Sequence, residues 1–215
     1  MKSQDIVVLL KLVSLHSAYF SDCDAEEFDV IYPPDKDENW LDNDFEDNYL
    51  SNFIVDSVEN RFSVRGLEAD TGISKSQISL SLNRMYDVGL AKLDRKSQLP
   101  KTNTKALLEF IAYGIKYVFP AKEGEITRGI ATSIAAPVLR GKLMTSGDLP
   151  PVWPYAKGKT KGMAVEPLHS NIIKTVRKDK RMYAMLALVD AIRIGHPRER
   201  NLALEKLEIM FKAVR

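Results

Sequence analysis

A stretch of hydrogen-bonding and cationic side chains without any acid lies between Gly72 and Asp87. If this stretch is helical, the residues that point away from its apolar side are Lys75, Ser76, Gln77, Ser79, Asn83 and Arg84. Amides and hydroxyls can hydrogen-bond base edges in a DNA groove, and Lys and Arg neutralise phosphates. A helix that only faces water would usually carry both signs of charge. The pattern therefore favours a helix that enters the major groove of double-stranded DNA.

The helix that would present these side chains is predicted over residues 74–87, after a shorter helix and a tight turn. One shared apolar side follows from the spacing of Val64, Leu67, Ala69, Ile73, Ile78, Leu82 and Met85. Gly72 falls at the bend, where glycine adopts a positive φ at no steric cost. Ser74 suits the N-cap, because its hydroxyl can accept a backbone N–H of the first turn.

The run ADTGISKSQISLSLNRMYDVGLAKL resembles the helix-turn-helix of winged-helix transcriptional regulators of the MarR type. The shared pattern is a small residue, Gly, an apolar residue, Ser-Lys-Ser, and then a Leu-rich helix that ends in Gly-Leu. This resemblance covers a short part of the chain and implies a DNA-binding module. It departs at Leu80, where such helices often carry a polar residue; Leu80 either contacts a thymine methyl or packs locally. The run through KYVFPAKEGEITRG and PPVWP resembles uncharacterised bacterial helix-turn-helix regulators.

Charge is distributed unevenly along the 215 residues. Residues 1–59 contain 3 Lys or Arg and 15 Asp or Glu, a balance of −12. Residues 60–215 contain 28 Lys or Arg and 14 Asp or Glu, a balance of +14, so that the whole chain has a net charge of +2. A basic body that carries the helix pair is what phosphate binding requires, because each neutralised phosphate releases counterions. The alternative is a surface that happens to be rich in lysine.

Residues 19–60 are predicted to be an acidic insert between the first helix and the helix pair. Residues 22–59 contain fourteen acids and one base, Lys36, and Pro33-Pro34 interrupts any continuous helix. Aromatic residues within the insert indicate that part of it packs, with a helix expected over residues 44–58. Three interpretations remain open: a solvated excursion that pads or dimerises the domain, a docking surface for a protein partner, and a DNA-mimicking flap.

The remaining pattern predicts a mainly α fold with minor β structure. An apolar stripe over residues 5–17 indicates a first helix behind the helix pair. Residues 91–101 suit a short wing, whose cations Lys92, Arg95, Lys96 and Lys101 could contact phosphates or the minor groove. Helices are expected over 103–118, 171–179, 182–194 and 198–214, and irregular, partly β structure over 121–167. We therefore expect a winged helix-turn-helix domain over residues 1–118 and a mixed, mainly helical region for dimerisation, effector or partner binding over residues 119–215.

The sequence gives no indication of catalysis. The three histidines are far apart in the chain, and the motifs of serine hydrolases, zinc peptidases and P-loop proteins do not occur. Cys23 lies in an acidic stretch that would raise its pKa, and one cysteine allows neither a disulfide nor a cysteine zinc site within the chain. No apolar run is long enough to span a bilayer, and the N-terminus lacks a signal-peptide cleavage site. We expect no catalytic residue, metal, cofactor or membrane contact, and a cytoplasmic location.

These observations predict a DNA-binding transcriptional regulator, specifically a repressor that acts as a homodimer on two half-sites. Ser76 and Gln77 would read bases. Phosphates would be held by Lys75, Ser79, Asn83, Arg84, Arg95 and Lys96, next to Ser74 at the start of the helix. The rival prediction is an antitoxin-like or adaptor protein that binds a partner through its C-terminal half and only autoregulates through DNA. A sensor with a small-ligand pocket between the halves is a third.

Overall fold

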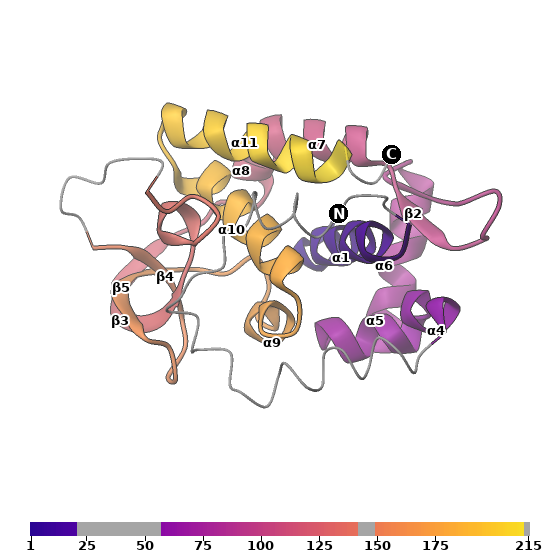
Figure 1. The fold of residues 1–215 in the computed structure, drawn as a ribbon, viewed down its shortest axis with the longest axis horizontal. Helices are drawn as coiled ribbons and strands as arrows, with labels where there is room; N and C mark the ends of the chain where they lie inside the picture. Colours follow the sequence, from indigo (N-terminus) through magenta and orange to yellow (C-terminus); the bar gives the residue numbers. More distant parts are fainter. Residues whose placement is uncertain (21–56, 142–148, 213–215) are drawn as a thin grey trace.

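The computed structural model describes residues 1–20, 57–141 and 149–212. These residues are mainly helical with two small sheets, which confirms the predicted class of mainly α structure with minor β (Figure 1). Most of the acidic insert, including nearly all of the helix expected over 44–58, lies outside the described residues. Its three interpretations therefore stay predictions.

Helix α1 (Ser3–Phe20) lies at the centre of the described structure and is buried on every side from Asp5 to His16. The sequence predicts one apolar stripe here, but α5, α6, α10 and β2 all pack against this helix and enclose its whole circumference (Figure 1). Its polar residues are consequently buried as well. Among these is Lys11, only 2% of which is exposed, and a buried charge of this kind requires partners.

The predicted helix pair is present as α5 (Val64–Thr71) and α6 (Lys75–Asp87), preceded by the short α4 (Val58–Phe62). Gly72 adopts the predicted left-handed conformation, with φ of 69°. Five of the seven residues expected on the shared apolar side are buried, namely Leu67, Ile73, Ile78, Leu82 and Met85. The expectation for Ala69 was wrong: Ala69 is exposed and Asp70 is buried instead, because Asp70 pairs with a cation of α1.

A two-stranded hairpin follows the pair, formed by β1 (Ala91–Leu93) and β2 (Pro100–Thr102) in antiparallel register. The helix predicted over 103–118 is broken at Gly114 into α7 (Thr104–Tyr113) and α8 (Ile115–Val118). After the break the last residues point outward, and Val118 is 49% exposed.

The second sheet contains β3 (Glu123–Ala131), β4 (Pro151–Pro154) and β5 (Thr160–Val165), with the short 3-10 helix η2 (Ser133–Ala135) after β3. Strand β3 is antiparallel to both others, β4 and β5 pair in parallel, and the three strands close on one another. This confirms the partly β structure expected over residues 121–167.

Helices α9 (Ile172–Val176), α10 (Lys180–Ile194) and α11 (Pro197–Lys212) complete the structure. Helix α10 is buried nearly all round and contacts α1, α9 and α11. It is tied to β4 by Asp190, whose carboxylate accepts hydrogen bonds from Trp153 Nε1 (2.6 Å) and Arg193 Nη1 (2.7 Å). Buried apolar side chains form one continuous core from α1 to α11. The domain boundary at residue 118 stays a prediction.

Candidate nucleic-acid interface

The outer face of α6 presents a stripe of small polar side chains. Ser76, Ser79, Leu80 and Asn83 are all exposed. Their spacing of three and four residues places them on one side of the helix, opposite the buried Ile78, Leu82 and Met85. Leu80 is 51% exposed, so it is not buried against its neighbours, and its contact with a thymine methyl stays a prediction.

The N-terminal end of α6 is also open to solvent. Ser74 occupies the predicted N-cap position, but its hydroxyl makes no capping hydrogen bond. The backbone N–H of Lys75 instead donates to Glu68 Oε1 on α5 at 3.3 Å. Lys75 Nζ lies 3.6 Å from Glu68 Oε2, and both side chains are well exposed, so this ion pair contributes little to stability.

Two of the predicted contact residues are held by α1. Gln4 Nε2 donates a hydrogen bond to Gln77 Oε1 at 3.0 Å, so the amide oxygen of Gln77 already has a partner. Arg84 donates from Nε and Nη2 to the two carboxylate oxygens of Asp5, at 3.2 and 2.5 Å. Burial alone would raise the pKa of Asp5, but the Arg84 guanidinium and the Ser81 hydroxyl hold it below its usual value. Asp5 therefore neutralises the charge that Arg84 would offer to a phosphate.

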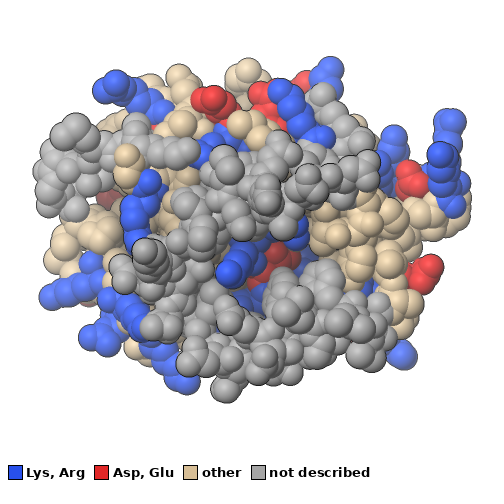
Figure 2. Space-filling model, viewed as in Figure 1, with Lys and Arg blue, Asp and Glu red and all other residues tan. Residues whose placement is uncertain are grey.

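The β1–β2 hairpin carries exposed cations beside α6. Arg95 and Lys96 lie exposed in its loop, and Lys92 lies directly opposite Lys101 across the two strands. Like charges in such a position destabilise a strand pair. Figure 2 shows Lys and Arg side chains at the right-hand end, where Figure 1 places this hairpin. Asp94 is engaged in the turn, because its Oδ2 accepts the backbone N–H groups of Lys96 (3.1 Å) and Ser97 (3.0 Å).

Helix α1 also fixes the hairpin. His16 Nε2 donates to the carbonyl oxygen of Pro100 at 2.9 Å, and Thr102 Oγ1 donates to the carbonyl oxygen of Leu9 at 2.9 Å. The His16 ring packs edge-on against Phe62 at a centroid distance of 4.7 Å. His16 therefore joins α1 to β2. One helix thus sets the positions of α6 and the hairpin relative to each other.

Burial lowers the pKa of His16 below the usual imidazole value, which gives a pH prediction. A histidine with a lowered folded-state pKa costs stability once the pH falls below its unfolded pKa of about 6.5. We expect the free energy of unfolding to fall between pH 7 and pH 5, and to fall less in His16→Gln, which keeps an N–H donor. Urea titrations at both pH values measure this difference. Burial also lowers the pKa of His169, but the wild type and His16→Gln both retain this residue, so its contribution cancels in the comparison. An identical pH dependence of the two proteins would contradict the prediction.

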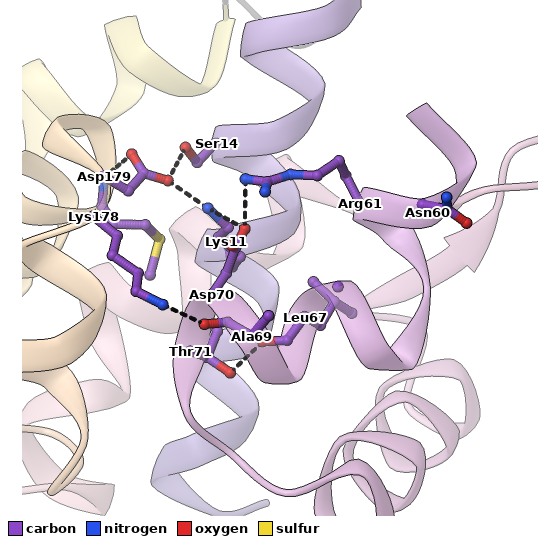
Figure 3. A network of polar contacts seen from close by, with 12 residues as sticks. Lys11, Ser14, Asn60, Arg61, Leu67, Ala69, Asp70, Thr71, Lys178 and Asp179 are labelled. Atoms are coloured by element: carbon purple, nitrogen blue, oxygen red, sulfur yellow. Dashed lines mark hydrogen bonds and ion pairs between the residues drawn. The ribbon is translucent and has the colours of Figure 1, made fainter. Parts of the chain in front are cut away.

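A buried charge network holds α5 in place behind α6 (Figure 3). Lys11 Nζ lies 2.9 Å from Asp70 Oδ2 on α5 and 2.8 Å from Asp179 Oδ2 just before α10. Ser14 Oγ donates to the same oxygen of Asp179 at 2.7 Å, and Arg61 Nη2 reaches Asp70 at 3.0 Å. Three elements distant in the sequence are therefore joined through one ammonium group. In the sequence, the only sign of this network is Lys11 itself, a single lysine within an apolar run. A lysine buried in such a run needs carboxylate partners.

The turn between α5 and α6 is bonded to the C-terminal half. Lys178 Nζ donates to the carbonyl oxygen of Ala69 at 2.7 Å, and Asn171 Nδ2 donates to that of Gly72 at 2.6 Å. Thr175 Oγ1 donates to the carbonyl oxygen of Thr71 at 3.3 Å. These donors satisfy carbonyls that a helix end leaves without intrahelical partners, and the Lys178 charge complements the negative end of the α5 dipole.

In the described ranges, no three or more His, Cys, Asp or Glu side chains gather closely enough to bind a metal ion. No helix among these residues has the length and apolar character to cross a membrane. The arrangement at α6 and the hairpin is instead one of hydrogen-bonding groups flanked by cations. Comparison of the chain with protein-family models, curated proteins and solved structures found no match.

Proposed function

We propose that this protein binds double-stranded DNA and regulates transcription, with α5, α6 and the β1–β2 hairpin acting as a winged helix-turn-helix. The observation that carries the proposal is the exposed stripe of Ser76, Ser79, Leu80 and Asn83 beside a cationic hairpin. Major-groove recognition needs hydrogen-bonding groups for base edges and cations for phosphates. Both sets of groups are attached to one buried helix, α1, which supports a preorganised interface.

The roles of the contact residues follow from their partners. Ser76 is exposed and would read bases, as the sequence predicts. Asn83, first expected to contact phosphates, lies on the same exposed stripe as Ser76 and would read a base instead. Gln77 would first have to exchange its hydrogen bond with Gln4. Arg84 is paired with Asp5 and would position α6 against α1. Phosphate contacts would come from Lys75 and from the hairpin cations Lys92, Arg95, Lys96 and Lys101.

Asn83→Ala is expected to relax sequence preference at one base pair. An Asn amide can bond adenine N6 and N7 together, and such a contact contributes about 1–3 kcal/mol of discrimination. Duplexes selected from a random pool by the wild-type protein are titrated with both proteins, alongside single-base variants of the selected sequence. Asn201→Ala, on the exposed side of α11, is the matched control. If Asn83→Ala keeps the wild-type preference at every position, Asn83 does not read a base.

The proposal also includes a homodimer that acts as a repressor on two half-sites. Half-sites about 34–36 Å apart fit two helices that enter successive major grooves. Exposed aromatic side chains on α7 and α8 support a protein contact, because Tyr113 and Tyr117 are 80% and 82% exposed. Sedimentation equilibrium at micromolar concentration tests the dimer, with and without the selected duplex. A protein that stays monomeric in both conditions has no such assembly.

A further inference from the structure

A second group of cations lies on the β3–β4–β5 sheet, at the other end of the molecule. Figure 2 shows Lys and Arg side chains gathered at the left-hand end, where Figure 1 places this sheet. Arg128 on β3 lies directly opposite Lys161 on β5, and both are exposed. Within the described part of the chain, neither has an ion-pair partner. Like charges directly opposite each other destabilise a strand pair, and a bound anion would offset the repulsion between them.

Two glycines fix the backbone that carries these cations. Gly158 is buried against β3, where an added Cβ would lie 2.2 Å from the carbonyl oxygen of Gly129. At Gly129 itself, an added Cβ would lie 2.0 Å from the carbonyl oxygen of Trp153. The loop before β5 is therefore pressed onto β3, and the exposed Lys157 in this loop lies near the same strands. Because the backbone is already firmly packed, binding through these cations adds no cost for ordering a loop.

The charge along β3 indicates what this surface could bind. Its acids, Glu123 and Glu125, precede Ile126, while Arg128 lies farther along the strand, directly before the residues that pair with β4. Glu123 is paired with Val165, the last residue of β5, whereas Lys161 is near the start of that strand. Arg128 and Lys161 on the strands, with Lys157 in the turn before β5, therefore lie apart from the acids of β3. Exposed cations of this kind suit sequence-independent contact with phosphates.

We propose that Arg128 and Lys161, together with Lys157, form a second, sequence-independent contact with the backbone of duplex DNA. The β1–β2 hairpin and this sheet lie at opposite ends of the long axis (Figure 1), so one protomer holds two duplex segments. Binding of the first segment, at α6 and the hairpin, rests on the proposed function. The contact made by β3 and β5 does not depend on the proposed function.

The test uses Arg128→Gln/Lys161→Gln in the full chain. Removal of the opposed charges is expected to raise the thermal midpoint, because the cross-strand repulsion is lost. Affinity for a random-sequence duplex is expected to fall by about 30-fold at 0.15 M salt, and the slope of log K against log salt is expected to fall by about two. Lys105→Gln/Arg198→Gln removes the same charge from exposed positions on α7 and α11, away from Tyr113 and Tyr117, and should change neither property.

A bridging assay separates this proposal from the proposed function. The wild type, bound to an immobilised duplex, is expected to retain a labelled second duplex, and Arg128→Gln/Lys161→Gln is expected to lose that retention. If α6 and the hairpin do not bind DNA, Arg95→Gln/Lys96→Gln will bind like the wild type while the sheet variant still loses binding. If Arg128→Gln/Lys161→Gln bridges two duplexes like the wild type and keeps its salt slope, the proposal is overturned. A dimer that bridges through its two α6 helices would give this result.

Discussion

Replacement of Lys11 by methionine is expected to lower the free energy of unfolding by about 3–5 kcal/mol at pH 7. The ammonium group lies within 3 Å of carboxylate oxygens of both Asp70 and Asp179, and all three side chains are buried. Methionine fills a similar volume but leaves the charge of Asp179 uncompensated in the core. Urea unfolding followed by circular dichroism measures the loss. Lys212→Met is the control, because its ion pair with Glu208 is exposed and should contribute less than about 1 kcal/mol.

The pH dependence of this loss identifies its cause. In the wild type, burial alone would raise the pKa of Asp179, but Lys11 and Ser14 hold it below its usual value. Its contribution to stability is therefore present above about pH 4 and is lost as the pH falls through the folded-state pKa. Without Lys11, burial would raise that pKa, and the penalty would grow as the pH rises. Lys11→Met should lose less stability at pH 4 than at pH 7; equal losses would point to packing alone.

Reversal of two hairpin charges, in Arg95→Glu/Lys96→Glu, is expected to weaken binding to the selected duplex by roughly a thousandfold at physiological salt. Loss of two phosphate contacts reduces affinity by about 30-fold at 0.15 M salt, because counterion release scales with the number of contacts. Repulsion between the introduced carboxylates and the phosphates adds an effect of similar size. The total is roughly a thousandfold. Fluorescence anisotropy with the selected duplex measures it across a salt series.

The design of this variant separates binding from folding. Arg95 and Lys96 are exposed, and the loop itself is held by backbone bonds to Asp94, so the thermal midpoint should stay close to that of the wild type. Lys105→Glu/Arg198→Glu makes the same change of net charge on α7 and α11, away from Tyr113 and Tyr117, and controls for long-range repulsion. A loss no larger than in this control would remove the hairpin from the interface.

Local patterns in the sequence predict much of this fold. The turn at Gly72 follows from glycine chemistry, and the burial of Leu67, Ile78 and Met85 follows from helical periodicity. The same periodicity predicts that Ser76, Ser79 and Asn83, on the opposite face of α6, are exposed.

Contacts between distant residues could not be predicted in this way. Gln77 and Arg84 share the outward direction expected of α6, but Gln4 and Asp5 bind them across 73 and 79 positions of sequence. The burial of Asp70 in place of Ala69 has the same origin, since Asp70 forms a buried ion pair with Lys11 of α1. Periodicity reports which side of a helix is apolar and carries no information about a charged partner elsewhere.

The bonds from Asn171, Thr175 and Lys178 to the end of α5 have a consequence for protein engineering. A chimera that receives residues 58–102 alone would acquire the stripe and the cations but would leave three carbonyl groups needing new donors. The angle between its two helices would then be set by the recipient scaffold. The smallest transplantable unit is therefore discontinuous in the chain, and it has to include residues 171–179 as well as the α1 surface that contacts them.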